Sequence, residues 1–153
     1  MYGVISILHA VSWSIVFGYY FFWGVILAIA RGKKDLDVKI ENEFMKGTLN
    51  VLPPVMAVSW IVALATGVWK TATIVRGSWS IMYSTTWGWL VTVGFAATIA
   101  AILVGVTQMI PTCKAILAYG RGETLFKRLA TLERINFSLV IVIMVVMLLA
   151  WAY

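Results

Sequence analysis

Charged residues are scarce in this sequence: Asp, Glu, Lys and Arg together make up 12% of its 153 residues, whereas hydrophobic residues make up 62%. A soluble domain has about 25% charged and roughly 45–50% apolar residues. A soluble fold of this composition would expose a largely apolar surface to water, so the composition excludes both a soluble enzyme and a disordered chain. The class that remains is a small integral membrane protein.

Cysteine and histidine each occur once, as Cys113 and His9. A disulfide within the chain is therefore excluded, as is a haem held by two histidines of one chain. A zinc site needs three or four Cys, His or carboxylate ligands, and the predicted spans contain one histidine and no acidic residue. The same lack of acidic residues argues against proton or ion transport. The methionines permit copper(I) binding, but no spacing among them supports it.

Four long stretches with few or no charges predict four transmembrane helices, since about 20 apolar residues cross a bilayer as a helix. The predicted spans are about residues 2–30, 51–75, 84–113 and 135–153. Pro53 and Pro54 are expected in the first turn of the second helix, where a missing N–H is tolerated. Pro111 is expected to kink the third helix, and the fourth helix is expected to start in water near Glu123. The fold class is thus all-α integral membrane, with one four-helix transmembrane domain.

Basic residues are concentrated in two of the three connections, which predicts the orientation of the chain. The first connection holds Arg31, Lys33, Lys34, Lys39 and Lys46, and the third holds Lys114, Arg121, Lys127, Arg128 and Arg134. Because short cytoplasmic loops carry an excess of Lys and Arg, both connections should be cytoplasmic and both termini outside. We expect a multi-pass protein of a prokaryotic inner membrane. The net charge of +6 fits this topology, and no nucleic-acid partner is expected because no nucleic-acid-binding motif accompanies the charge.

Two stripes of small residues at four-residue spacing are candidates for helix–helix contact, because close backbone approach drives association in lipid. They are Ala10, Ser14 and Gly18 in the first helix and Ala97, Ala101 and Gly105 in the third. An aromatic belt is expected at the outer boundary of the membrane, where indole and phenol rings are favoured. Its residues are Trp69, Trp79, Trp87, Trp89, Trp151 and Tyr153.

His9 is the main candidate for chemistry, because an ionisable side chain within a span is costly and by default functional. Trp13, Phe17 and Tyr20 follow on nearly the same face of the helix. An imidazole above an aromatic wall would suit a b-type haem with His9 as its axial ligand. It would equally suit a histidine that is hydrogen-bonded to a neighbouring helix.

Depth in the membrane limits which residues can meet His9. Counting about seven residues inward from the outer ends, at roughly 1.5 Å each, reaches Gly67 in the second helix and Met147 in the fourth. Gly67 has no side chain and would let a ring approach its backbone, beside Thr66. Met147 is a candidate second axial ligand, because a thioether sulfur can bind haem iron.

Three short motifs resemble one family of small bacterial membrane proteins. They are the segment 7–13 around Leu8-His9, the pair Thr66-Gly67, and Arg134-Ile135-Asn136. The family comprises the copper-resistance D type and the four-helix membrane protoporphyrinogen oxidase, whose first helix opens with a Leu-His pair. The resemblance implies a four-helix fold with His9 as a haem ligand. The oxidase also has a lysine in its third helix and an acid after the Asn, whereas residues 84–113 contain no lysine and Phe137 follows Asn136.

Two functions follow from these observations. The favoured one is an accessory, non-catalytic transmembrane subunit of a larger membrane redox complex, because the lysine of the oxidase is missing and the chain consists of four almost bare helices. Its partners would be other membrane subunits and the lipid bilayer. The alternative is a b-type haem-binding redox protein, with His9 as axial ligand and Trp13, Phe17, Tyr20 and Gly67 around the haem.

Overall fold

The computed structural model describes residues 2–32, 38–119 and 123–152, and these are helical apart from the turn at 76–80 and Thr85. The elements are α1 (Tyr2–Gly32), α2 (Val38–Val75), α3 (Ile81–Ser84), α4 (Thr86–Val104), the π-helical turn η1 (Gly105–Met109), α5 (Ile110–Tyr119) and α6 (Glu123–Ala152). Four segments are long and apolar enough to cross a membrane, namely Gly3–Phe22, Pro53–Val75, Thr86–Tyr119 and Thr124–Ala152. The predicted all-α fold with four candidate spans is confirmed.

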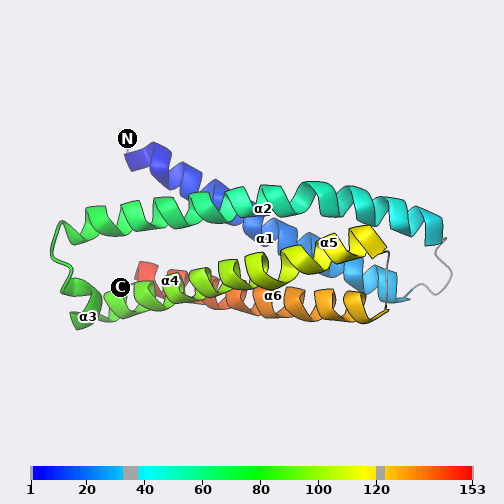
Figure 1. Cartoon of the computed structure of the whole chain (residues 1–153). Coiled ribbons are helices and arrows are strands. Elements are labelled where there is room, and N and C mark those ends of the chain that lie inside the picture. The colour runs from blue at the N-terminus through cyan, green and yellow to red at the C-terminus, as the bar shows by residue number, and fades with distance from the viewer. Residues whose placement is uncertain (1, 33–37, 120–122, 153) are drawn as a thin grey trace.

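The long helices lie lengthwise against one another in a bundle (Figure 1). α1 packs mainly along α2, and α4 packs mainly along α6. The two ends of the chain and α3 lie at one end of the bundle, whereas Val38 and Glu123, where α2 and α6 begin, lie at the other. The central core is formed by buried residues of all four long helices: Val16, Tyr20, Met56, Trp60, Ala97, Ala101, Val140 and Ile143.

α2 begins earlier than predicted, at Val38 rather than near residue 51, so Pro53 and Pro54 lie inside the helix and not in its first turn. Residues 38–50 include good helix formers such as Lys39, Glu41 and Glu43, and the helix therefore forms before the apolar span starts at Pro53. Prolines inside membrane helices are tolerated, because neighbouring groups and local adjustment satisfy the carbonyls that they leave unbonded.

The distortion predicted at Pro111 takes the form of a π-helical turn directly before the proline. The backbone N–H of Ile110 donates to the carbonyl of Gly105 instead of following the α-helical pattern. Pro111 has no N–H to donate and its ring would clash with the carbonyl four residues earlier, which a wider turn relieves. The π turn thus joins α4 to α5 without ending the membrane-crossing segment Thr86–Tyr119.

α6 begins at Glu123, as predicted, but its apolar segment Thr124–Ala152 includes an acidic residue. The expectation that no acidic residue lies within a span is therefore wrong: Glu133 lies in that segment and is only 5% exposed. The first part of α6 is amphipathic, with Arg128 and Arg134 exposed and Leu129 fully buried. Glu133 belongs to the buried face of α6. Counting charges along the sequence does not distinguish this face from the exposed face.

Only one of the two small-residue stripes makes helix contacts within the chain. Ala97 and Ala101 are buried in the core, as expected. Ala10, Ser14 and Gly18 are exposed, so a helix contact of this stripe stays a prediction that would have to involve another chain. α1 instead buries Ser12, Val16 and Tyr20, which have the same spacing on a different face of the helix.

The tryptophans of the expected aromatic belt lie near the bundle end that holds the two chain termini. Trp69, Trp79, Trp89 and Trp151 are exposed there, on α2, the following turn, α4 and α6. Trp87 is half-buried against Val75, Met82 and neighbouring residues. Tyr153 lies outside the described residues.

Candidate functional site

The imidazole of His9 is hydrogen-bonded to α2. Its Nδ1 atom lies 3.1 Å from the carbonyl oxygen of Ala63 and 2.8 Å from the hydroxyl oxygen of Thr66. A carbonyl only accepts, so Nδ1 carries the proton and donates to both oxygens. The Thr66 hydroxyl in turn donates to the carbonyl of Val62 at 2.6 Å. Nε2 is the ring nitrogen that remains for another partner.

The structure brings His9 and Gly67 into contact. A Cβ placed on Gly67 would lie 3.3 Å from Cε1 of His9 and 3.6 Å from Cε1 of Phe95. The missing side chain thus makes room for the imidazole of His9 and the ring of Phe95. A side chain at position 67 would press on the His9 ring, so Gly67 allows α1, α2 and α4 to pack closely at this depth.

The other predicted site residues lie in or against the central core. Trp13 meets the His9 ring edge-on at 6.3 Å and the Trp60 ring at 5.4 Å between ring centres. Tyr20 is a buried core residue, and Phe17 packs against the same core. Met147 also packs against it, with its Cε near Gly94 of α4.

These contacts meet one of the two requirements for haem. Nδ1 of His9 is held by a backbone carbonyl, which orients the ring and leaves Nε2 for iron, as in many metal-ligating histidines. The second requirement is a slot for the macrocycle. At Gly67 the space is filled by His9 and Phe95 themselves, and the aromatic wall packs into the core. The residues as arranged do not hold a haem, and we derive no chemistry through one.

A second polar group, which the sequence interpretation missed, lies between α1 and α6. The Tyr19 hydroxyl donates to Oε1 of Glu133 at 3.2 Å. One turn further along α6, the amide nitrogen of Asn136 donates to the sulfur of Met109 at 2.8 Å, and Asn136 is 1% exposed. The signal in the sequence was the spacing of Glu133 and Asn136, which places both on one face of a helix together with Leu129 and Val140.

Both α6 side chains keep one buried polar atom without a partner among the described residues. These atoms are Oε2 of Glu133 and Oδ1 of Asn136. A buried acceptor without a hydrogen bond destabilises a protein by about 1–3 kcal/mol, and a charged one by more. Such atoms are rare in native structures, where buried polar groups are bonded to the protein or to ordered water, so each of these two oxygens calls for a partner such as a water molecule or a ligand.

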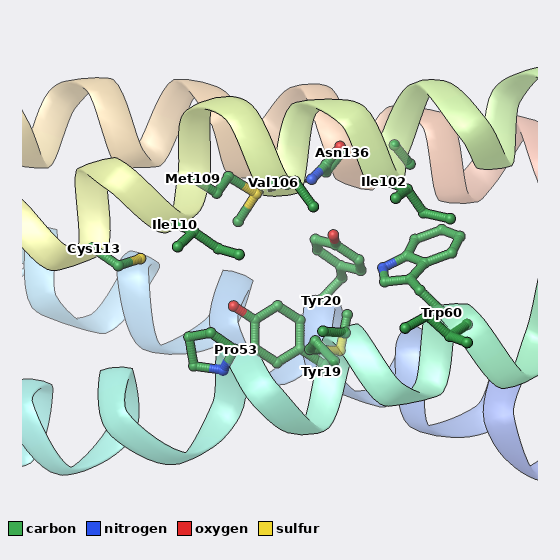
Figure 2. A pocket seen from close by; sticks show the side chains of 15 residues that line it. Tyr19, Tyr20, Pro53, Trp60, Ile102, Val106, Met109, Ile110, Cys113 and Asn136 are labelled. Carbon is green, nitrogen blue, oxygen red and sulfur yellow. Dashed lines mark hydrogen bonds between the residues drawn. The ribbon is translucent and has the colours of Figure 1, made fainter.

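Asn136 lies in the wall of a cavity of about 120 Å³ between α1, α2, η1 and α6 (Figure 2). The cavity is lined by Tyr19, Tyr20, Pro53, Met56, Ala57, Trp60, Ile61, Ala101, Ile102, Gly105, Val106, Met109, Ile110, Cys113 and Asn136. In Figure 2 the Tyr20 hydroxyl is directed toward Asn136, whereas the Tyr19 hydroxyl is directed toward the side of Cys113. Gly105 and Met109 bring the π turn into the wall, so the distortion before Pro111 shapes the cavity.

The cavity is predominantly apolar with a few fixed polar groups, which is the usual make-up of a small-molecule site. Aromatic rings of Tyr19, Tyr20 and Trp60 form part of its wall, and Asn136 supplies a buried amide (Figure 2). Such a site can bind and orient an apolar molecule that carries a polar group. Among the described residues there is no group of three or more His, Cys, Asp or Glu side chains that could hold a metal ion.

No family model, no curated protein and no solved structure matches this chain. The resemblance to the copper-resistance D type and the membrane oxidase therefore rests on the three short motifs alone. Of these motifs, Leu8-His9 and Thr66-Gly67 meet in one contact between α1 and α2, and Asn136 lies in the cavity wall. The function has to be argued from these two sites.

Proposed function

We propose that the chain is a membrane-embedded protein that binds a lipid-soluble small molecule in the cavity between α1, α2, η1 and α6. The observation that carries the proposal is the Asn136 side chain, which is buried in the cavity wall with Oδ1 unpartnered among the described residues. Ile61 and Val106 line the cavity and are 64% and 56% exposed, so its walls reach the outer, apolar surface of the bundle. A molecule dissolved in the bilayer would therefore enter from the side.

A photoreactive alkyl-phenyl diazirine in lipid nanodiscs tests this proposal. We expect saturable labelling of residues 101–113 at a low mole fraction of probe, because a built site fills whereas bulk lipid contact does not. Ala57→Phe places a ring at the exposed side of the cavity and should abolish saturation. Ala65→Phe is the matched control, since Ala65 is exposed on the same helix and does not line the cavity. Labelling that rises linearly in wild type, or that Ala57→Phe leaves unchanged, would refute the proposal.

The role of accessory subunit in a larger membrane redox complex is a second candidate, and the exposed stripe of α1 favours it. Ala10, Ser14 and Gly18 form a surface without large side chains, and the Ser14 hydroxyl is already bonded to the carbonyl of Ala10. Such a surface lets another transmembrane helix approach closely. Gly18→Leu should release co-purifying membrane subunits, whereas Gly24→Leu, at an exposed glycine of α1 beyond the end of this stripe, should not. Equal yields for both variants would count against this role.

Binding of a b-type haem at His9 stays a separate prediction. It requires Phe95 and the core residues around Trp13 to move so that the porphyrin ring fits. Nε2 of His9 would be the axial ligand, and Met147 is the candidate second ligand. A Soret band that shifts on reduction and is absent from His9→Ala would support it. A colourless wild-type protein, purified in mild detergent with haem added during expression, would exclude it.

We infer that the chain lies in a prokaryotic inner membrane with both termini outside. Lys114, Arg128 and Arg134 are exposed on α5 and α6 toward the bundle end opposite the termini, which fits a cytoplasmic face. Lys33, Lys34 and Arg121 lie outside the described residues. In intact spheroplasts of a Cys113→Ser background, Ser78→Cys should react with an impermeant maleimide, and Lys114→Cys should react only after lysis. The reverse pattern would overturn this orientation.

A further inference from the structure

The position of the cavity between α1, α2, η1 and α6 suits the head group of an amphiphile. On α2 its wall runs from Pro53 to Ile61, which is the start of the apolar span and lies toward the bundle end opposite the chain termini (Figure 1). Ile61 and Val106 in its wall are exposed to the lipid. A head group can therefore lie inside while an aliphatic chain lies in the bilayer, so the volume of about 120 Å³ does not limit the length of the ligand.

Three hydrogen-bond donors of the cavity wall are already used within the protein. The Tyr20 hydroxyl accepts from the side chains of Asn136 and Trp60. The Tyr19 hydroxyl donates to Oε1 of Glu133. None of the described residues that line the cavity is basic. A phosphate or carboxylate would therefore have no counter-charge here, and it would have to break existing hydrogen bonds to obtain these donors.

A buried carboxylate lies directly behind the cavity wall. Glu133 is only 5% exposed, and its Oε1 is bonded to Tyr19, a lining residue. The electrostatic interactions of Glu133 reach three lining residues, namely Tyr19, Tyr20 and Cys113. A buried acidic side chain in a membrane span is costly unless it is paired. The surroundings of the cavity are thus suited to a positive charge.

The two arginines that flank Glu133 on α6 do not bond to its second oxygen. Arg128 donates to Oε1 of Gln108 at 2.6 Å, and Arg134 is exposed. Oε2 of Glu133 has no hydrogen-bond partner among the described residues. A positive charge supplied by a ligand would reduce the cost of burying this carboxylate, because opposite charges attract more strongly in an apolar interior than in water.

The aromatic side chains of the wall favour a cation over a neutral group of the same shape. Tyr19, Tyr20 and Trp60 lie together on the α1 and α2 side of the cavity (Figure 2). The face of an aromatic ring attracts an organic cation electrostatically, and tryptophan does so best. A neutral alkyl group would be buried equally well but would not gain this attraction.

We propose that the cavity binds the head group of a lipid-soluble organic cation of the alkylammonium class, with its positive charge between the aromatic rings and the Glu133 carboxylate and its aliphatic chain leaving past Ile61 and Val106 into the bilayer. This inference rests on the proposed function and names its ligand class. It concerns binding alone and involves no chemical step on the ligand. It implies that the affinity depends on the charge of the head group more than on its shape.

A pair of ligands with the same shape tests this dependence on charge: decyltrimethylammonium and its neutral analogue with carbon in place of nitrogen. The readout is displacement of the alkyl-phenyl diazirine that labels residues 101–113 in lipid nanodiscs. The two ligands are compared at equal mole fraction in the bilayer, after correction for their partition into empty nanodiscs. We expect the cation to displace the probe at about one tenth of the mole fraction that the neutral analogue requires.

Two substitutions of Glu133 test the source of the preference. Glu133→Gln keeps the size of the side chain and removes the charge, so it should remove most of the advantage of the cation and leave the neutral analogue unaffected. Glu133→Asp is the matched control, because it keeps the charge and should retain most of the advantage.

The outcomes separate this inference from the proposal on which it rests. If both ligands displace the probe equally from the wild-type protein, the cavity is a general apolar site and the cation inference is overturned, while the proposed function stands. If the probe does not label saturably, both are overturned. A cation preference that Glu133→Gln leaves intact, or that Glu133→Asp loses equally, would overturn the role of the Glu133 charge. The wild-type comparison decides the ligand class even if Glu133→Gln does not fold.

Discussion

The hydroxyl of Tyr19 donates a hydrogen bond to Oε1 of Glu133 over 3.2 Å, which joins α1 to α6 across 114 residues of sequence. The second carboxylate oxygen has no partner among the described residues, although Glu133 is only 5% exposed. An acidic side chain in a membrane span is expensive, and it is usually found where a polar or water-filled site needs it. The Tyr19–Glu133 pair therefore lies beside the cavity as part of its polar surroundings.

Removing the Tyr19 hydroxyl should destabilise the protein. Tyr19→Phe leaves the aromatic ring in the cavity wall but takes away the donor to the Glu133 carboxylate. A buried acceptor that loses its partner costs about 1–3 kcal/mol, so we expect the free energy of unfolding to fall by that amount. Steric trapping in bicelles measures this quantity for membrane proteins.

The control for this prediction is Glu133→Met, which removes both carboxyl oxygens and keeps a side chain of similar length. In the Glu133→Met background, Tyr19→Phe should cost about half as much or less, because the acceptor of the Tyr19 hydrogen bond is gone. Equal effects of Tyr19→Phe in both backgrounds would show that this hydrogen bond contributes nothing and that ring packing explains the loss.

Thr66 should hold His9 in one tautomer. Thr66→Val keeps the shape of the side chain and removes the oxygen that lies 2.8 Å from Nδ1 of His9, leaving only the Ala63 carbonyl. We expect a loss of stability of about 0.5–1.5 kcal/mol, toward the lower end because side-chain hydrogen bonds in membranes average near 0.6 kcal/mol. Thr66→Ser keeps the hydroxyl and should behave as wild type. Nitrogen-15 NMR of the single histidine should show the proton on Nδ1, and a proton on Nε2 would contradict the bonding described.

The fold could be predicted from the sequence because the hydrophobicity of its long apolar segments dominates it. Long apolar runs have no alternative to a transmembrane helix, and the start of α6 at Glu123 followed from the helical spacing of Leu125, Leu129 and Leu132. The start of α2 could not be predicted in the same way. Hydropathy shows where the apolar span begins, at Pro53, but not that the helix has already started at Val38.

The site could be predicted only in part, because sequence spacing fixes a face of a helix but not what that face meets. Matching depths in the membrane did place His9 beside Gly67. The exposed face of α1 with Ala10 and Gly18 could not be told from its buried face, since both carry residues at the same spacing. Glu133 was missed because Lys127, Arg128 and Arg134 suggested that this part of α6 lies outside the membrane. These basic residues are on the exposed face of the helix, whereas Glu133 is on the buried face.

Gly88 should be the least replaceable glycine among those described. It lies at the start of α4, where its N–H donates to the Thr85 hydroxyl, and a Cβ there would overlap the carbonyl oxygen of Ile81 and the backbone of Met82. Backbone atoms cannot move aside as a flexible side chain does, so Gly88→Ala should open the α3–α4 turn and cost more than the roughly 1–3 kcal/mol of ordinary overpacking.

Gly18→Ala is the control for this prediction. A Cβ at position 18 meets nothing within 4 Å, so the substitution should be neutral or stabilising by up to about 1 kcal/mol. Similar melting temperatures for the two variants would contradict this account.

Replacing Asn136 by an apolar residue should stabilise the ligand-free protein. Asn136→Leu keeps the number and branching of the side-chain heavy atoms and removes an acceptor that is buried without a partner among the described residues. It gives up a hydrogen bond to the Met109 sulfur, which is a weak acceptor, and one to the Tyr20 hydroxyl. We expect the free energy of unfolding to rise by about 1 kcal/mol, since the desolvation penalty of the oxygen is no longer incurred. Thr98→Val removes a buried hydroxyl that is already bonded to the Gly94 carbonyl, so it should be neutral or slightly destabilising.

A gain in stability at Asn136 alone is the pattern of a residue kept for binding rather than for folding, because functional sites hold groups that the fold would be more stable without. If Asn136→Leu instead loses stability by more than Thr98→Val, the amide is a structural bridge between α6 and the π turn, and the cavity loses the polar group on which its binding role depends.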